Sequence, residues 1–206
     1  ENPDNSITWY AQEIMAEGTR ISRITSDLLF YSRQQKQTHS PADIRDIIHR
    51  TLTLIDGVLK KDQIEIQILP APDLPLIKCR SQQIQQILMN LLTNARDTLN
   101  EKYHSSHPDK VIILSTELYE DAGRRWIRIS VEDHGKGIPQ DYRDKLFDPF
   151  FTTKPRDVGT GLGLPISYGI ARDHHGRLEY DTKEGQYTQF HLHLPVDNGW
   201  DIEEHH

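Results

Sequence analysis

Residues 85–97 read Gln-Gln-Ile-Leu-Met-Asn-Leu-Leu-Thr-Asn-Ala-Arg-Asp, and this stretch decides the fold. The apolar residues in and around it recur every three or four positions, which predicts a helix with one apolar face. They are Ile84, Ile87, Leu88, Leu91, Leu92, Ala95 and Leu99. Ser81 is a candidate N-cap, and the helix is expected to reach about Asn100.

Two asparagines lie at the edge of this apolar face. Asn90 and Asn94 are four residues apart, so their side chains are neighbours on the helix surface. A carboxamide in such a place needs hydrogen-bond partners or a cation bound to its oxygen. The alternative for the helix alone is an ordinary exposed pair, and the choice depends on segments farther along the chain.

The composition limits the classes of function. The 206 residues suit one domain with an extension, and the formal net charge of −7 does not support a nucleic-acid surface. The single cysteine, Cys79, excludes an intramolecular disulfide and suits a reducing compartment. No stretch has the apolar length of a membrane span. We therefore expect a cytoplasmic chain without direct membrane contact, although a parent protein could carry an anchor elsewhere.

Four segments are predicted along the chain. Residues 1–34 contain a heptad pattern that is typical of one helix of a coiled coil or bundle, so a partner helix is implied. Residues 35–40 are a polar linker, and residues 41–196 form the main domain. Residues 197–206 are a tail whose two final histidines are typical of a purification-tag remnant.

The main domain mixes helical and strand patterns. Helices are expected after Asp43, from Ser81 and over 164–174; strands are expected at 64–68, 76–79, 111–118, 126–131, 177–181 and 188–195. The last four strands form two hairpins. This order predicts an α+β fold in which one helical layer covers a mostly antiparallel sheet.

Three glycine-bearing or aromatic loops connect these elements. They are Val-Glu-Asp-His-Gly-Lys-Gly-Ile-Pro (131–139), Leu-Phe-Asp-Pro-Phe-Phe-Thr-Thr-Lys (146–154) and Gly-Thr-Gly-Leu-Gly-Leu (159–164). A lone Gly-x-Gly is usually only a turn, but here Asp133 precedes it at a strand end. The third loop opens a helix, where glycines and the helix dipole favour a phosphate group. It is no P-loop, because no Gly-Lys-Ser/Thr follows.

Together these segments resemble the catalytic, ATP-binding domain of sensor histidine kinases. Residues 90–95 resemble the N box, 133–138 the first glycine box, 147–154 the F box and 159–164 the second glycine box. The resemblance covers residues 41–196 and implies the two-layer α/β sandwich of the Bergerat-type ATP-binding fold. This fold is shared with DNA gyrase, heat-shock chaperone ATPases and mismatch-repair ATPases, the GHKL superfamily. Residues 13–33 are similar to the second helix of the dimerisation and phosphotransfer domain.

The resemblance also implies roles for single residues. Asn94 would bind Mg²⁺ through its carbonyl oxygen, and Asp133 would accept a hydrogen bond from the adenine amino group. Asn90 and Asn94 would be the catalytic residues. Asn90 stands where hydrolysing relatives have a water-activating glutamate, and its amide cannot take a proton, so little hydrolysis is expected. The implied ATP-binding residues are Asp133, Gly135, Gly137, Ile138, Phe150, Thr153, Lys154, Gly159, Thr160, Gly161, Leu162, Gly163 and Leu164. Lys154 and Arg96 are either phosphate contacts or ordinary solvated charges.

One part of the family pattern is missing. No histidine here is followed by the acidic residue and proline of the phosphoacceptor box. We therefore expect a chain that binds ATP and Mg²⁺ without phosphorylating itself. Its expected partners are a response-regulator receiver domain and, in the parent, a second copy bound through the dimerisation helices. The alternatives are an ATP-binding regulatory module without phosphotransfer, and an ATPase, which Asn90 disfavours.

Overall fold

The computed structural model describes residues 38–155 and 159–197, Gly199, and six residues near the N-terminus, namely 9, 10, 14, 15, 17 and 18. Those six residues are helical. The rest of the helix predicted over 1–34, most of the linker and most of the tail lie outside the described residues, so these boundaries stay predictions.

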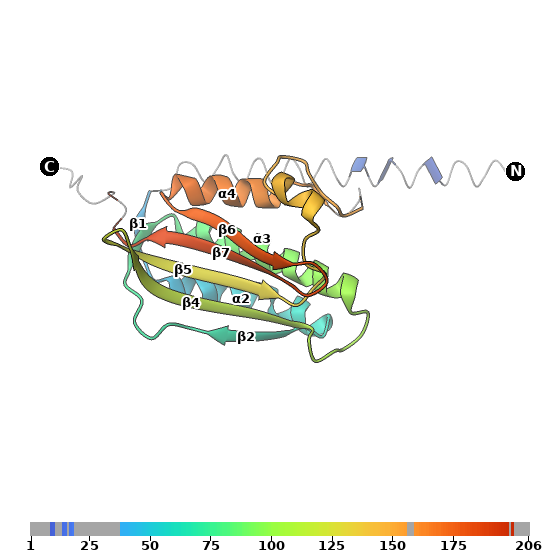
Figure 1. Cartoon of the computed structure of the whole chain (residues 1–206), viewed down its shortest axis with the longest axis horizontal. Coiled ribbons are helices and arrows are strands. Elements are labelled where there is room, and N and C mark those ends of the chain that lie inside the picture. The colour runs from blue at the N-terminus through green and yellow to red at the C-terminus, as the bar shows by residue number, and fades with distance from the viewer. Residues whose placement is uncertain are drawn as a thin grey trace, which may run out of the picture.

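A five-stranded mixed sheet forms one layer of the domain (Figure 1). Its strand order is β2-β4-β5-β7-β6. The bounds are Glu65–Leu69 for β2, Val111–Asp121 for β4, Arg124–Asp133 for β5, Arg177–Lys183 for β6 and Tyr187–Pro195 for β7. Only β2 pairs in parallel, with β4, and the other neighbours are antiparallel. Both predicted hairpins are confirmed, and their four strands run longer than the predicted ranges.

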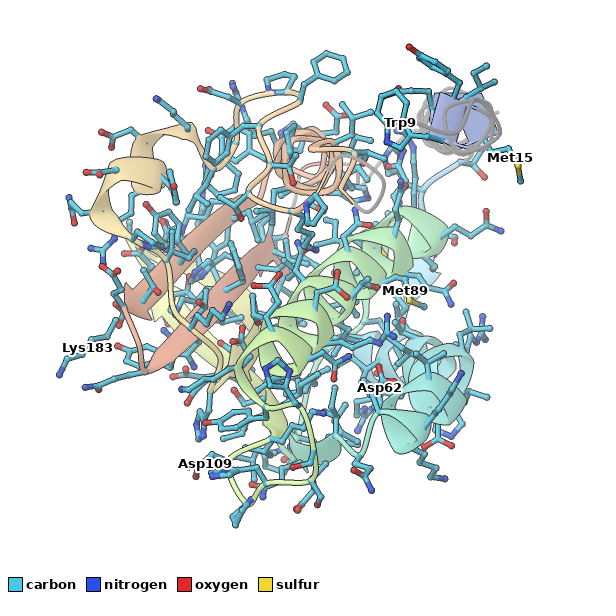
Figure 2. The ribbon with its side chains drawn as sticks, turned by 90° about the vertical axis from the view of Figure 1, so that its right-hand side faces the viewer. Trp9, Met15, Asp62, Met89, Asp109 and Lys183 are labelled. Atoms are coloured by element: carbon cyan, nitrogen blue, oxygen red, sulfur yellow. The ribbon has the colours of Figure 1, made fainter. Side chains whose placement is uncertain are left out.

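Three helices form the other layer, on one side of the sheet (Figure 2). They are α2 (Ile44–Lys61), α3 (Ser81–Lys102) and α4 (Gly163–Asp173). A small two-stranded sheet of β1 (Ser40–Ala42) and β3 (Ile77–Cys79) lies apart from the main sheet. The expected α+β sandwich is thus confirmed. Among the described residues, none of the helices combines the length and apolarity needed to cross a membrane.

The predicted apolar face of α3 forms the centre of the core. All seven of its apolar residues are buried, and they pack with the inner faces of the strands. The N-cap of this helix is Arg80, and Ser81 is already its first helical residue, so the predicted cap was one residue late. Asp43 is the N-cap of α2, where its side chain accepts a hydrogen bond from the Arg45 N–H at 2.8 Å.

The C-terminal end of α4 is joined to the start of α3 through His174. Its Nδ1–H donates to the Ile170 carbonyl at 2.8 Å, and its Nε2 accepts from the Arg80 N–H at 3.1 Å. Burial lowers the pKa of His174 to about 4, so the ring is the neutral tautomer that these two bonds require. The ring of His39, which directly precedes β1, meets His174 edge-on with the ring centroids 5.9 Å apart.

Candidate nucleotide-binding site

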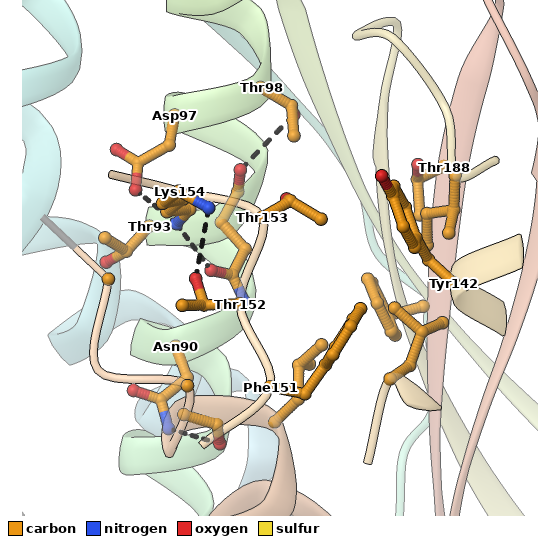
Figure 3. Close-up of a pocket in the computed structure, with 18 of the residues that line it drawn as sticks. Asn90, Thr93, Asp97, Thr98, Tyr142, Phe151, Thr152, Thr153, Lys154 and Thr188 are labelled. Carbon is orange, nitrogen blue, oxygen red and sulfur yellow. Dashed lines mark hydrogen bonds and ion pairs between the residues drawn. The ribbon is translucent and has the colours of Figure 1, made fainter. Parts of the chain in front are cut away.

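The four sequence boxes surround one pocket of about 320 Å³ (Figure 3). Its walls come from α3, the end of β5, the loop at 137–139, the 3-10 helix η1 (Gln140–Lys145), the loop at 151–154 and the start of α4. The predicted site residues that line it are Asn90, Asn94, Asp133, Gly137, Ile138, Thr153, Lys154, Gly159, Thr160, Gly161, Gly163 and Leu164. Gly135, Phe150 and Leu162 do not line it.

Asp133 is the buried acid of this pocket. It ends β5 and is only 4% exposed. Its Oδ1 accepts the Gly135 N–H at 2.9 Å and the Thr98 hydroxyl at 3.0 Å. Burial raises the pKa of Asp133 to about 6, against the effect of these two bonds, so the carboxylate predominates at neutral pH. A buried acceptor at the wall of a pocket suits a ligand that brings N–H donors.

Gly135 supports the position of the Asp133 carboxylate although it does not line the pocket. A Cβ on Gly135 would lie less than 3.0 Å from Asp133 Oδ1 and from Thr98 Oγ1, so only glycine permits this approach. Lys102, at the end of α3, donates from Nζ to the carbonyls of His134 at 2.7 Å, Gly135 at 2.8 Å and Gly185 at 3.1 Å. The first glycine loop is thereby fixed to α3.

The structure shows a row of residues that the sequence interpretation recognised only in part. Asn90, Asn94, Thr98 and Lys102 follow one another at intervals of four on α3 and contact either the pocket or its loops. Neighbours at this spacing lie on one stripe of a helix. Extending the Asn90–Asn94 pair by the same interval could have identified Thr98 and Lys102.

Phe150 and Phe151 have opposite positions in the 146–154 loop. Phe150 has a φ of 69° and a side chain that is 61% exposed, whereas Phe151 lines the pocket beside Tyr142, with ring centroids 5.8 Å apart. The left-handed backbone at Phe150 turns the chain and brings the following ring inward. The sequence resemblance implied Phe150, because two adjacent phenylalanines do not reveal which one faces the pocket.

Asn90 connects α3 to the first turn of α4. Its Nδ2 donates to the Gly163 carbonyl and to Ser167 Oγ, both at 3.1 Å, and the Ser167 hydroxyl donates to the same carbonyl at 2.8 Å. Ser167 is fully buried. The side chain of Asn90 therefore positions the second glycine loop, a role that the sequence did not indicate.

Asn90→Ala is expected to lower the free energy of unfolding by about 1–3 kcal/mol, because the Gly163 carbonyl and the buried Ser167 hydroxyl each lose one of their hydrogen bonds. Urea titrations of Asn90→Ala, Ser167→Ala and the double variant measure this loss. The two substitutions share one network, so their effects should not add. Additive effects in the double variant would show that the two side chains act independently.

Arg96 and Lys154, the two cations that could bind phosphate, point to different places. Arg96 is ion-paired with Asp62 of the α2 C-terminus and lies 3.6 Å from Asp97, and it does not line the pocket. Lys154 lines the pocket, and its Nζ donates to Asn94 Oδ1 at 3.0 Å and to Asp97 Oδ2 at 2.5 Å (Figure 3). Of the two, the structure places Lys154 where a phosphate could reach it.

The oxygens that surround Lys154 Nζ also test the fit of a metal ion. An amide oxygen and a carboxylate oxygen already hold one cation, the lysine ammonium. Hard cations such as Mg²⁺ take oxygen ligands of these two kinds. The donor set therefore fits the divalent ion that the sequence resemblance implied at Asn94.

The start of α4 offers backbone donors to an anion. Leu162, at the N-cap, makes no side-chain capping bond, and the N–H groups of Gly163 and Leu164 belong to the first turn, where a helix provides no intrahelical acceptor. Gly161 has a φ of 66°, and a Cβ there would lie less than 3.0 Å from the backbone of Phe150. The Phe150 N–H donates to the Gly161 carbonyl at 2.9 Å, so the aromatic loop and the second glycine loop are directly joined.

Known proteins are similar to this chain in sequence. Residues 79–198 match the family described as Histidine kinase-, DNA gyrase B-, and HSP90-like ATPase. Sporulation kinase E of Bacillus subtilis is 32% identical over 187 residues, which cover 91% of this chain and 24% of that protein. Sensor histidine kinase ZraS of Escherichia coli is 32% identical over 186 residues, covering 90% of this chain and 37% of that protein. The chain thus spans well under half the length of these two relatives.

Solved structures agree on the fold. Full-length ShkA in complex with AMPPNP superposes with a TM-score of 0.69 at 24% identity, over 91% of this chain and 38% of that one. The catalytic domain of histidine kinase ThkA superposes with a TM-score of 0.64 at 25% identity, over 78% of this chain and 97% of that one. With more than half of its residues matched by the family model, the chain belongs to the histidine kinase-, DNA gyrase B- and HSP90-like ATPase family.

Proposed function

We propose that this chain is the ATP-binding catalytic part of a sensor protein-histidine kinase. One observation carries the proposal: a buried acid, an oxygen pair that holds a cation and an uncapped helix N-terminus all face one pocket. These three features suit, in order, an adenine amino group, a metal ion and a phosphate chain. The names of the curated relatives, a sporulation kinase and a sensor histidine kinase, agree with this activity.

Asp133 would provide the base specificity. Its carboxylate accepts hydrogen bonds only, so it pairs with the amino group of adenine. Guanine presents a carbonyl oxygen at that position, which would leave two buried acceptors facing each other. Such a mismatch costs on the order of 1–3 kcal/mol.

The phosphates would extend from the base toward the first turn of α4. Its N–H groups and Lys154 would bind them, and Asn94 would hold Mg²⁺ through its carbonyl oxygen. The bound metal would neutralise charge that develops on the phosphate oxygens. A histidine of a separate phosphotransfer domain would attack the γ-phosphorus in line, the bond to the β–γ bridging oxygen would break, and ADP would leave.

Hydrolysis is disfavoured at this site. Asn90 is an amide, which cannot accept a proton from water, and its Nδ2 is engaged with Gly163 and Ser167. Bound ATP would therefore persist until an acceptor histidine arrives. The phosphorylated histidine would then donate to the aspartate of a response-regulator receiver domain, in a homodimeric parent protein.

Phosphotransfer to a separate domain tests this function. The chain is incubated with γ-labelled ATP, alone and with an added domain that carries an acceptor histidine followed by the acid and proline. Acid-labile, base-stable label is expected on the added domain only. Label on this chain alone would reveal an acceptor histidine within it, and no transfer despite ATP binding would favour a regulatory module.

Asn94→Ala is expected to remove most of the Mg²⁺ dependence of ATP binding while the fold is kept. The substitution deletes the proposed ligand oxygen but none of the seven core residues of α3. Calorimetric titrations with Mg²⁺ and with a chelator give the ratio of the two affinities. The ratio should fall toward one, and an unchanged ratio would contradict the metal role of Asn94.

A further inference from the structure

Lys154 Nζ lies between two oxygens of α3. Asn94 Oδ1 is 3.0 Å away and Asp97 Oδ2 is 2.5 Å away, and Figure 3 shows Lys154 beside α3, next to Asp97. Asn94 and Asp97 are three residues apart, which places them on one face. A carbonyl and a carboxylate thus converge on a single positive charge.

The loop directs Lys154 toward α3. The Lys154 N–H donates to Thr152 Oγ1 at 3.2 Å. A Cβ on Gly159 would lie less than 3.0 Å from both Thr152 Oγ1 and Lys154 Cβ, so this glycine allows the two loop segments to pack closely. The side chains of Lys154 and Asp97 are only 20% and 22% exposed. Partial exclusion of water strengthens an ion pair compared with one at the open surface.

The same carbonyl cannot serve this lysine and a metal at once. Mg²⁺ binds oxygen at about 2.0–2.1 Å and tolerates little distortion of its octahedron. An ammonium group that keeps its contacts with both oxygens would stand against the divalent ion at close range. Lys154 must therefore leave the oxygen pair when the metal arrives, and phosphate groups in the same pocket offer it a new anionic partner.

Asp97 needs a cation in both states. Without one, its carboxylate would face the phosphates as a like charge inside a partly closed pocket. If Lys154 moves to the phosphates, the metal or the water molecules that it carries must take its place at Asp97. Mg²⁺ usually retains several waters, so either direct or water-mediated contact satisfies the carboxylate.

We propose that Lys154 and Mg²⁺ alternate on the oxygen pair of Asn94 and Asp97. Lys154 occupies the cation position in the nucleotide-free chain, and Asp97 is a second oxygen group of the metal site. This inference rests on the proposed function. It makes the free pocket a poor site for metal alone, so metal and nucleotide enter together.

The competition is tested with Mn²⁺ in the absence of nucleotide. Electron paramagnetic resonance measures free Mn²⁺ in titrations of the wild type and of Lys154→Met. Lys154→Met should bind Mn²⁺ about tenfold more tightly, because the resident cation is gone. Lys145→Met is the matched control, since it removes the same charge from an exposed position on η1 and should leave Mn²⁺ affinity unchanged. Equal affinity in Lys154→Met and the wild type would overturn the proposed exchange.

The role of Asp97 is tested with ADP. Calorimetry gives the ratio of ADP affinity in Mg²⁺ to that in a chelator, for the wild type, Asp97→Asn and the exposed control Asp144→Asn. Asp97→Asn should reduce the ratio about tenfold without weakening metal-free ADP binding. A ratio equal to that of the wild type would exclude Asp97 from the metal site.

These outcomes separate the inference from the proposed function. A wild-type chain that binds no nucleotide in either buffer would refute the proposed function itself. The wild type could instead show normal Mg²⁺-dependent nucleotide binding while the variants keep the wild-type Mn²⁺ affinity and the wild-type ratio of ADP affinities. That result would refute only the exchange of Lys154 and Mg²⁺. Thermal denaturation of each variant shows that the compared proteins are folded.

Discussion

Asp133→Asn is expected to lower the affinity for adenine nucleotides by about tenfold to a hundredfold while the chain stays folded. Oδ1 of the carboxylate is engaged by the Gly135 N–H and the Thr98 hydroxyl, and Oδ2 would be the acceptor for the proposed adenine amino group. An asparagine has one acceptor oxygen, so it can serve either the loop or the base. In each orientation its NH₂ group faces another donor. Calorimetry with ADP measures the loss, and equal affinities would refute the assignment.

The pH dependence gives an independent check of the same residue. Burial raises the pKa of Asp133 to about 6, so acidification through this value protonates the acceptor. Nucleotide affinity of the wild type should therefore fall as the pH decreases below about 6. The stability of the free chain responds in the opposite sense, because the folded state binds this proton more tightly than the unfolded state and acidification from pH 6 toward 4 relieves the buried charge. In Asp133→Asn, neither the nucleotide affinity nor the stability should change with the protonation of this side chain.

Gly137→Ala is expected to weaken nucleotide binding and to lower the free energy of unfolding by about 1–3 kcal/mol. Its φ is 66°, and a Cβ there would lie less than 3.0 Å from the carbonyl of Lys183. Because the clash is with backbone, no side-chain rotation can relieve it. The first glycine loop must move away from the β6–β7 turn, and Asp133 loses the support of the following residues.

Gly123→Ala is the matched control for this substitution. Gly123 also has a positive φ, 74°, but a Cβ there would meet nothing within 4 Å. It carries the same backbone penalty without the clash, at the turn between β4 and β5. Urea unfolding and ADP calorimetry of both variants separate the two effects. Equal losses of stability in the two variants would show that close packing at Gly137 is unimportant.

The sequence predicted the elements that depend on local patterns. The apolar face of α3 and the apolar segments that predicted β4, β5 and β7 are patterns of neighbouring residues, and the structure confirms these elements. The order and spacing of the four boxes predicted the pocket. The asparagine pair at the edge of α3 was correctly expected to need partners.

Features that depend on contacts between distant segments could not be predicted. Asn90 meets Gly163 and Ser167 more than seventy positions away, and Lys102 reaches the turn at Gly185. A side-chain pattern indicates which face is buried but not which atoms lie opposite it. The sequence resemblance implied Phe150, whereas Phe151 lines the pocket, and this difference depends on the left-handed backbone at Phe150. The 3-10 helix η1 could not be predicted either, because it has no buried apolar residues.

The attachment of α4 to α3 at both of its ends places this helix between the pocket and His39. Asn90 holds its first turn to the middle of α3, and His174 holds its last turn to the start of α3. Eleven residues of α-helix make a stiff rod of about 16 Å, and two anchorages on one neighbour close it into a rigid frame. This arrangement connects the second glycine loop to His174 and to the adjoining His39 ring through α4 alone, without a contact that involves the sheet. The neutral ring of His174 keeps that frame intact until the pH approaches 4.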